Sequence, residues 1–472
     1  MRFRPAKSKA KKGGTSNKVK RWTFLTRLDI LRTLALTRLC GYPNIPRPDN
    51  MPNRYGSPRI LYVTRIWPRE CGAHVRSLNI LRALQQIGQV DVVGLNRAGS
   101  ASSPVSWSEF KTTYTFDFKL RPNRGLSDKI RWTVDPKFEY PNGFAVEDEA
   151  VSRILSRLTS FDLIWFSTIH VADMFPATIW PNSVLDIDDL QSSHGRTSLK
   201  VQSHPWERFL ALRKIFVWKR RERLLGQRFT LLCACSDEDR RYLAQIGVQV
   251  PVHVIPNAFE KPAAEPARNP VEPPRIGFIG FFGYSPNRDG IQWFVDHCWS
   301  RVKAAVPDAR LRLIGQGSDC IRTLASPDVD SLGWLPDPSE EIRTWSAMVV
   351  PVRQGAGTRV KIAQAFSQKC PIVSTSLGAY GYGAVNGYDM FLADTPEAFS
   401  DACVRAIREP RVATEIAERA WCRFLDHWTW DAVHPRVWAA AEDCLRMRTR
   451  CRSVPLGSAK SSSTAIFLNM VV

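Results

Sequence analysis

The feature that most constrains the fold is an alternation of short apolar runs and helical segments that occurs twice along the 472 residues. In its first occurrence, we expect a strand at residues 59–64, a helix at 75–87 and a second strand at 90–95. A strand, a helix and a further strand in that order form a right-handed unit with a parallel sheet. Further strands of this sheet are expected at residues 163–166, 184–187 and 231–234.

The alternation begins again after a proline-rich linker at residues 256–274. The expected elements are strands at 275–280, 310–315, 347–352 and 371–375, and helices at 291–306 and 360–368. The fold class is therefore α/β, with two Rossmann-like domains that face a central cleft. Ligands of such sheets bind at the carboxyl ends of the strands.

The predicted organisation has five parts. They are a basic, partly disordered arm (1–56), an N-terminal Rossmann-like domain (57–258), a C-terminal Rossmann-like domain (275–427), a helix (428–447) and a disordered tail (448–472). We expect the helix to cross back to the N-terminal domain.

The formal net charge is +21, and residues 1–24 hold nine Lys or Arg and no acid. Such a chain can meet nucleic acid, anionic lipid or phosphorylated small molecules, and charge alone does not choose among them. Residues 22–39 form a basic amphipathic pattern that either lies on an anionic membrane or packs on its own domain. We expect peripheral membrane contact through residues 1–40, and no nucleic-acid partner. Without an apolar run of about 18 residues or an apolar signal core, the expected location is the cytoplasm.

Three glycine-containing loops follow predicted strands. The first, at residues 67–76, contains Gly72 and ends on Arg76; the second, at 276–290, contains Gly280 and Gly283. Glycine lets the backbone approach a ligand closely, and the N-terminus of the next helix offers N–H donors to an anion.

The third loop is the most specific and has the sequence Gly355-Ala356-Gly357-Thr358-Arg359-Val360-Lys361, ahead of a helix that contains Gln364. A glycine loop, two cations and the positive end of a helix dipole together suit two phosphates.

On these three stretches, residues 59–447 resemble the family 4 (group 1) glycosyltransferases of GT-B fold, in their glycine-loop subgroup. The resemblance implies a hexosyltransferase-like enzyme that is retaining, needs no metal and uses a nucleotide-sugar as its substrate, with no cofactor. It assigns the donor phosphates to Gly72, Gly283, Gly355, Gly357, Arg359 and Lys361, and the donor ribose to Gln364.

Two positions depart from the family pattern. The family usually has glutamates eight residues apart where this chain has Ala356 and Gln364. The amide oxygen of Gln364 still accepts a hydrogen bond from a hydroxyl, but it has no charge. This change places donor affinity and turnover in doubt more than the fold.

Other polar residues are candidates for the acceptor side. His170 follows the strand at 163–166 and is the candidate catalytic residue, because a histidine there can bind the sugar or move a proton. Arg76, Asp189 and His194 are expected on the acceptor side. Asp186, Asp188 and Asp189 also have the spacing of a divalent-cation site, but we favour a structural or acceptor-contacting role and expect no metal.

Three further segments favour structural roles. Residues 206–228 mix eight Lys or Arg with apolar residues; we expect a helix with its apolar stripe packed and its basic face in solvent, the alternatives being nucleic-acid or membrane contact. Cys233 and Cys235 suit a buried strand better than a metal site. Ser236 has the position of a helix N-cap, and residues 254–258 that of a hinge.

The sequence therefore predicts transfer of a sugar from a nucleotide-sugar donor to a saccharide or lipid-linked acceptor, in polysaccharide or glycolipid biosynthesis. Two alternatives remain open at this point. One is a sugar-nucleotide epimerase of similar fold, and the other is a non-catalytic protein that binds nucleotide-sugars.

Overall fold

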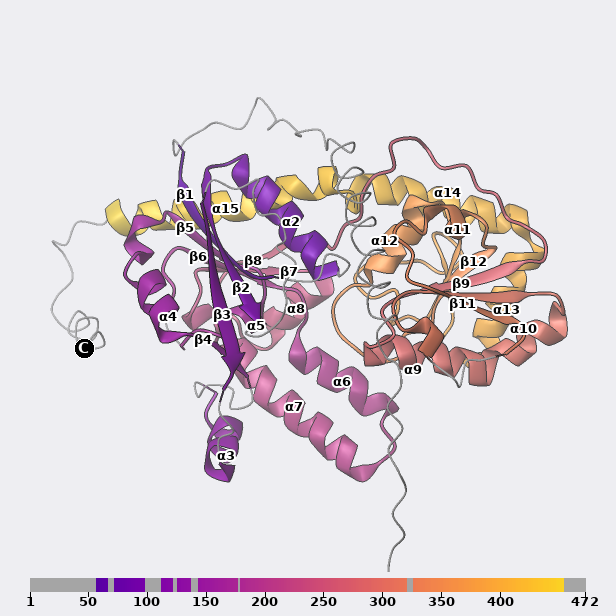
Figure 1. The fold of residues 1–472 in the computed structure, drawn as a ribbon, viewed down its shortest axis with the longest axis horizontal. Coiled ribbons are helices and arrows are strands. Elements are labelled where there is room, and N and C mark those ends of the chain that lie inside the picture. Colours follow the sequence, from indigo (N-terminus) through magenta and orange to yellow (C-terminus); the bar gives the residue numbers. More distant parts are fainter. Residues whose placement is uncertain are drawn as a thin grey trace, which may run out of the picture. The chain divides into compact units, whose positions relative to one another are not determined.

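The computed structural model describes residues 57–66, 72–97, 112–121, 125–136, 143–176, 179–320 and 326–453. This part of the chain contains two β-sheets with helices packed on them, which confirms the predicted fold class (Figure 1). The predicted basic arm, with its amphipathic segment and expected membrane contact, lies outside the described residues.

The first sheet has the strand order β4-β3-β2-β1-β5-β6-β7-β8. Neighbouring strands are parallel except for the antiparallel β3–β4 pair. Its strands are β1 (Arg59–Arg65), β2 (Gln89–Arg97), β3 (Thr112–Leu120), β4 (Phe144–Val146), β5 (Leu163–Phe166), β6 (Ser183–Ile187), β7 (Leu231–Ala234) and β8 (Val252–Val254). Its α-helices are α2 (Gly72–Gln85), α3 (Leu126–Val134), α4 (Asp148–Leu155), α5 (Ile169–Ala172), α6 (Gln191–Val201), α7 (Pro205–Arg223) and α8 (Asp237–Gln245).

The second sheet is parallel throughout and has the order β11-β10-β9-β12-β13-β14. Its strands are β9 (Arg275–Ile279), β10 (Arg310–Ile314), β11 (Val329–Gly333), β12 (Ala347–Val350), β13 (Ile372–Ser374) and β14 (Phe391–Leu392). Its α-helices are α9 (Ser285–Phe294), α10 (Ser300–Ala305), α11 (Ser339–Arg343), α12 (Val360–Ser367), α13 (Pro396–Arg408) and α14 (Pro410–His427).

Both sheets have the strand order of a Rossmann fold. The chain reverses its direction of winding at β1, which pairs with β2 and β5, and at β9, which pairs with β10 and β12. A crevice opens at such a reversal, outside the carboxyl ends of the strands. The loops that follow β1, β9 and β12 hold the three glycine motifs, so the topology places these motifs at ligand-binding ends.

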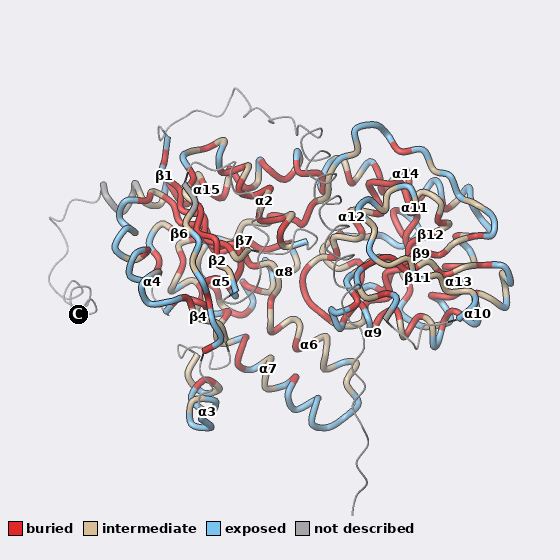
Figure 2. Tube along the Cα trace, viewed as in Figure 1, coloured by how far each residue is buried: buried red, intermediate tan, exposed pale blue. Residues whose placement is uncertain are grey.

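The central strands of the second sheet, β9, β12 and β13, are largely buried, whereas β11 at the side is partly exposed (Figure 2). On β12, Ala347 and Val349 belong to one apolar cluster, while Met348 and Val350 belong to another. Successive side chains of a strand point to opposite faces, so the two clusters form two core layers, one on each side. Because both faces of β12 are buried, its sequence is a continuous apolar run.

The C-terminal helix α15 (Trp430–Ser453) crosses back to the first domain, as expected from the sequence. It packs beside α2 and against the first sheet (Figure 1). The Trp438 indole donates a hydrogen bond of 2.9 Å to the carbonyl of Ala83 in α2. The helix continues past residue 447 to Ser453, where the sequence predicted a disordered tail. No helix in the described part is long and apolar enough to span a membrane.

Two helices, α9 and α7, differ from what the sequence predicted. The helix expected from residue 291 begins at Ser285, with Pro286 in its first turn. Proline suits that position because its ring fixes a helical φ angle and the missing N–H would have no partner there. In α7, the apolar side chains that we expected to pack are largely exposed, among them Phe209, Leu212 and Phe216.

Candidate functional site

Two cations lie together at the N-terminus of α12. Lys361 is in the first turn of the helix, and Arg359 is its N-cap residue. Burial, together with the smaller effect of the neighbouring Arg359, lowers the pKa of Lys361 from 10.5 to about 7. Neither side chain forms an ion pair with a carboxylate in the described part of the chain. Two cations that lie close together with no ion-pair partner in the described residues suit an anion, although the buried Asp189 and Asp239 lie near enough for the charge of Arg359 to favour their ionised forms.

The guanidinium of Arg359 is only partly satisfied. Its Nη1 donates 2.9 Å to the carbonyl of Gly357 and also donates to that of Ala356. Its Nε and Nη2 have no hydrogen-bond partner in the described part of the chain, although the residue is only 8% exposed. Buried donors without partners cost stability, which a bound anion would recover.

The loop between β9 and α9 encloses Lys361. The Asn287 side chain accepts a hydrogen bond of 2.9 Å from Lys361 Nζ and donates one of 2.9 Å to the carbonyl of Phe281. A methyl group at Gly280 would lie 3.0 Å from Lys361 Nζ, so this glycine leaves the space that the ammonium group needs. Gly283 is exposed further along the same loop. The structure thus brings the second and third glycine motifs together.

The first motif reaches the same place. Gly72 is the first residue of α2, and a methyl group there would lie 3.4 Å from the side chain of Val360, the first residue of α12. Each helix N-terminus has a partial positive charge and N–H groups without helical partners. Two such ends and two cations therefore converge at one location.

The glycine loop itself contacts the first domain. The Gly355 N–H donates 2.9 Å to Thr197 Oγ1, and the same hydroxyl donates 2.8 Å to the Gly355 carbonyl. Gly357 has a φ of +69°, and a methyl group there would overlap Asp189 Oδ1 and lie 3.0 Å from the carbonyl of Asp188. In this conformation the Gly355 N–H is therefore occupied by Thr197 and not free for a phosphate.

Two more hydrogen bonds join the domains beside this loop. The Asn257 amide donates 2.9 Å to Thr358 Oγ1, and the Tyr380 hydroxyl donates 2.8 Å to Asp239. Asn257 lies in the predicted hinge. Asp239 is in the first turn of α8, whose N-cap is Ser236 as predicted.

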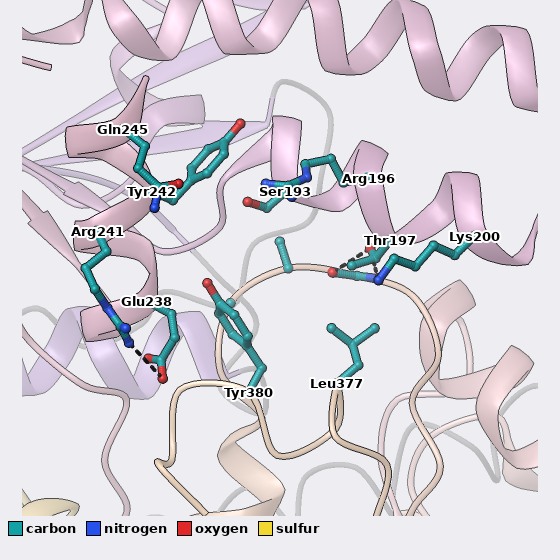
Figure 3. A pocket seen from close by; sticks show the side chains of 13 residues that line it. Ser193, Arg196, Thr197, Lys200, Glu238, Arg241, Tyr242, Gln245, Leu377 and Tyr380 are labelled. Carbon is teal, nitrogen blue, oxygen red and sulfur yellow. Dashed lines mark hydrogen bonds and ion pairs between the residues drawn. The ribbon is translucent and has the colours of Figure 1, made fainter. Parts of the chain in front are cut away.

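A cavity of about 420 Å³ lies on the first-domain side of the glycine loop (Figure 3). Its walls come from α6, α8, the glycine loop and the segment with Leu377 and Tyr380. Three cations line it, Arg196, Lys200 and Arg241, and Arg241 pairs with Glu238 at 3.5 Å. A volume of this size suits a sugar-sized ligand.

The predicted acceptor-side residues separate in space. His194, next to the cavity residue Ser193, accepts or donates a 3.2 Å hydrogen bond with Ser198, and burial lowers its pKa to about 4. His170 is exposed at the start of α5, where its ring lies 3.4 Å from the Gln191 amide. No interaction in the described part joins His170 to Lys361 or Arg359.

Arg76 is in the interior. Its guanidinium bonds both carboxylate oxygens of Asp186, at 2.9 and 2.7 Å, and also donates to Asn257 and to the carbonyls of Ile255 and Pro256. All its N–H groups are thereby used, and it is 3% exposed. This geometry gives Arg76 a bracing role beneath the hinge and lends no support to its predicted place on the acceptor side.

Gln364 is in α12, one turn after Lys361, and its side-chain amide makes no hydrogen bond within the described residues. Cys233 and Cys235 are buried free thiols, as the strand interpretation expected. In the described part, no group of three or more His, Cys, Asp or Glu could hold a metal ion.

Sequence reasoning missed Asn287, Thr197 and Tyr380. Asn287 was placed in a loop, and the start of α9 at Ser285-Pro286 is the signal that locates it in a first helical turn. Thr197 and Tyr380 meet partners 158 and 141 residues away in the sequence, and no local pattern marks such pairs.

Comparison with known proteins matches part of the chain to a family model and most of the chain to solved structures. Residues 273–409 match the model of the glycosyl transferases group 1 family. An uncharacterized 44.6 kDa protein in the cps region of Klebsiella pneumoniae is 23% identical over 154 residues, which are 30% of this chain and 40% of that protein. The matched part is thus less than half of that relative's length.

Several solved structures have the same fold as this chain over most of its length and over nearly all of their own. Sucrose-phosphate synthase from Thermosynechococcus elongatus has a TM-score of 0.60 at 14% identity, covering 84% of this chain and 100% of that one. Anabaena HepE, in complex with UDP and glucose, has a TM-score of 0.55 at 13% identity, covering 82% and 100%. WaaG, a glycosyltransferase involved in lipopolysaccharide biosynthesis, has 0.51 at 11%, covering 82% and 99%. At these identities the likeness establishes the GT-B fold.

Proposed function

We propose that this chain, which has a glycosyl transferases group 1 domain over residues 273–409, transfers a sugar from a nucleotide-sugar donor to a saccharide or lipid-linked acceptor. The observation that supports it best is the pair of cations, Lys361 and Arg359, which form no ion pair within the described residues and lie where the N-termini of α2 and α12 meet. The likeness to HepE, solved with UDP and with UDP-glucose, makes a uridine donor the first to test.

Departure of a nucleoside diphosphate leaves negative charge on the terminal phosphate. Lys361 Nζ and the free Nε and Nη2 of Arg359 would neutralise this charge, and preorganised groups do so without reorganisation during the reaction. The anion would also raise the pKa of Lys361, so that the ammonium is fully charged when the donor is bound. We propose that these protein charges replace a divalent metal, that no cofactor takes part, and that the transfer retains configuration.

The acceptor would enter the cavity beside the glycine loop. His194 is neutral near pH 7 because burial lowers its pKa to about 4, so its ring has a lone pair that can accept a hydrogen bond from an acceptor hydroxyl and orient that hydroxyl. Asp189, whose pKa is raised by burial and by Asp188, lies against Gly357 at the edge of this cavity. We propose His170 as an alternative contact to the sugar. For a phosphate to reach the Gly355 N–H, the loop must leave Thr197.

Gln364 supports a second candidate function. Its amide oxygen would accept a hydrogen bond from a ribose hydroxyl, but a neutral acceptor is weaker than a carboxylate. A protein that binds the donor and turns it over slowly, or not at all, would have this residue. Biosynthesis of a polysaccharide or glycolipid remains the proposed role in either case.

The test begins with thermal unfolding of the full chain in the presence of UDP, GDP, ADP and their sugars. A ligand at a hundred times its Kd raises stability by about 2.7 kcal/mol, enough to move the midpoint clearly. The stabilising donor is then supplied with a radiolabelled sugar, with and without a mixture of saccharide and lipid-linked acceptors.

The outcomes separate the candidates. A transferase moves the label to the acceptor, an epimerase alters the sugar without an acceptor, and a binder leaves the donor intact. Gln364→Glu should tighten donor binding and raise turnover in a transferase. Stabilisation by none of these nucleotides would refute the proposed donor site.

A further inference from the structure

The cavity beside the glycine loop takes two of its walls from helices of the first domain. Its lining residues recur at intervals of three and four in both helices, so they share one face of each helix. From α6 they are Ser193, Arg196, Thr197 and Lys200, and from α8 they are Glu238, Arg241, Tyr242 and Gln245. The two sets lie on opposite sides of the cavity (Figure 3). Both walls are therefore polar, and their charge indicates what the cavity would bind.

The lining of the cavity is positively charged. Three of its residues are Lys or Arg and one is an acid, which gives a formal charge of +2. Glu238 lies 3.5 Å from Arg241 and offsets that cation. Arg196 and Lys200, by contrast, form no ion pair within the residues that the structure describes. The surplus positive charge thus belongs to α6.

Helix α6 has no acid of its own to balance these cations. Its 11 residues include Arg196 and Lys200, four positions apart, and neither Asp nor Glu. Like charges at this spacing destabilise a helix because they lie one turn apart on the same face. Since both side chains line the cavity, an anion held there would relieve the repulsion and accept hydrogen bonds from both.

Arg196 rests on a fixed aromatic platform. Its guanidinium lies 5.4 Å from the ring centre of Tyr242 on α8. The Tyr242 hydroxyl and Ser192 Oγ form a hydrogen bond of 2.8 Å, and the Ser192 N–H donates one of 2.9 Å to the buried carboxyl group of Glu222. The ring is therefore held in place, and a guanidinium packed on it keeps its N–H groups in one orientation.

A ligand for this cavity would be of sugar size and would have a negative charge. The volume of about 420 Å³ suits a sugar. Arg196 and Lys200 suit the carboxylate of an acidic sugar and the phosphate of a phosphorylated one, because both groups accept several charged hydrogen bonds. The donor diphosphate is assigned to Lys361 and Arg359 at the start of α12, and neither of these lines the cavity. The cavity therefore has cations of its own, separate from the proposed donor site.

We propose that the acceptor is an acidic saccharide whose carboxylate or phosphate binds Arg196 and Lys200. The inference rests on the proposed transfer reaction and adds to it the chemical class of the acceptor. A neutral saccharide would leave the two like charges of α6 uncompensated, so it should bind more weakly. Arg196 and Lys200 would thus determine which acceptor is chosen.

The test compares three monosaccharides that differ in one group, namely glucose, glucuronate and glucose 6-phosphate. Ligand-observed NMR, which detects weak binding, measures the affinity of the full chain for each, with and without UDP. We expect at least one charged sugar to bind about tenfold more tightly than glucose and to lose this advantage at high salt. The charged sugar that binds more tightly identifies the acidic group.

Two double variants locate the effect. Arg196→Gln with Lys200→Gln should lower the affinity for the charged sugar about tenfold and leave the binding of glucose and UDP unchanged. The matched control is Lys219→Gln with Arg240→Gln, which removes the same charge from α7 and α8 outside the cavity and should bind as wild type does. The thermal midpoint of each variant shows that it is folded.

Equal affinity of wild type for the three sugars would overturn the proposal, and so would an Arg196/Lys200 variant that keeps the preference for a charged sugar. Loss of UDP affinity in that variant would assign the two cations to the donor instead of the acceptor. A wild-type chain that prefers the charged sugar through these cations but does not bind UDP would refute the donor site alone.

Discussion

Replacing Lys361 by methionine should stabilise the protein when no donor is added and should abolish donor binding. Burial and Arg359 lower the pKa of this lysine from 10.5 to about 7. Each pKa unit is about 1.4 kcal/mol, so holding the ammonium in place destabilises the fold by about 4 kcal/mol near pH 7. Methionine avoids that penalty but loses the hydrogen bond to Asn287, about 1 kcal/mol. Because Lys361 is only partly buried, we expect a net stabilisation of about 2 kcal/mol.

The sign of the pH dependence provides a second readout. Between pH 7 and 10.5, the unfolded lysine is protonated more than the folded one. Wild-type stability should therefore rise with pH across this window, and Lys361→Met should lack that rise. Urea denaturation at several pH values measures this difference, and calorimetry with UDP measures the lost affinity.

Lys369 provides the matched control. It is also a lysine with little exposure, but Glu265 and Glu418 raise its pKa against the lowering effect of burial. Lys369→Met should thus reduce stability by about 1 kcal/mol and leave nucleotide affinity unchanged. A Lys361→Met variant that is less stable than wild type at pH 7 and binds UDP equally well would contradict this prediction.

Three further predictions rest on single contacts, and urea denaturation measures each. Gly357→Ala should lose about 1–3 kcal/mol, because its methyl group overlaps Asp189 at a φ of +69°, whereas Gly387→Ala, with φ +74° and open space around it, should show the backbone strain alone. Arg76→Met should lose about 3–5 kcal/mol by leaving Asp186 buried without its partner, and adding Asp186→Leu should recover most of the loss. Burial raises the pKa of Glu222 from 4.5 to about 7, so the stability of wild type relative to Glu222→Gln should fall by up to about 3 kcal/mol as the pH rises through this window. The account of Gly357 would be contradicted by equal losses in the two glycine variants, and that of Arg76 by a double variant no more stable than Arg76→Met. The account of Glu222 would be contradicted by a stability difference between wild type and Glu222→Gln that does not change with pH.

Much of the fold could be predicted because parallel strands are buried on both faces and appear as short apolar runs. Strands β5 and β7 occupy the predicted residues, and β12 ends two residues early. The segment from β3 to α4 was not predicted. The β3 sequence alternates polar and apolar residues at the side of the sheet, and β4 has three residues, so neither presents a clear apolar run.

The site could be predicted in part. The glycine–Arg–Lys motif is local in sequence, and α12 places its cations at a helix end as expected. The structural role of Arg76 could not be predicted, because its partner Asp186 is 110 residues away in the sequence. The sequence around an arginine does not show whether the side chain binds a ligand or a buried carboxylate. The exposure of α7 also escaped prediction. Its apolar residues have helical spacing, which indicates a face but does not say what covers it.

A crystal structure of the full chain with the nucleoside diphosphate that stabilises it most would test the central claim directly. We expect the diphosphate within hydrogen-bonding distance of Lys361 Nζ and of the Arg359 Nε and Nη2 atoms, which have no hydrogen-bond partner among the described residues. We also expect the ribose beside Gln364. A diphosphate bound elsewhere, with Lys361 still bonded only to Asn287, would contradict the claim that these two cations form the donor site.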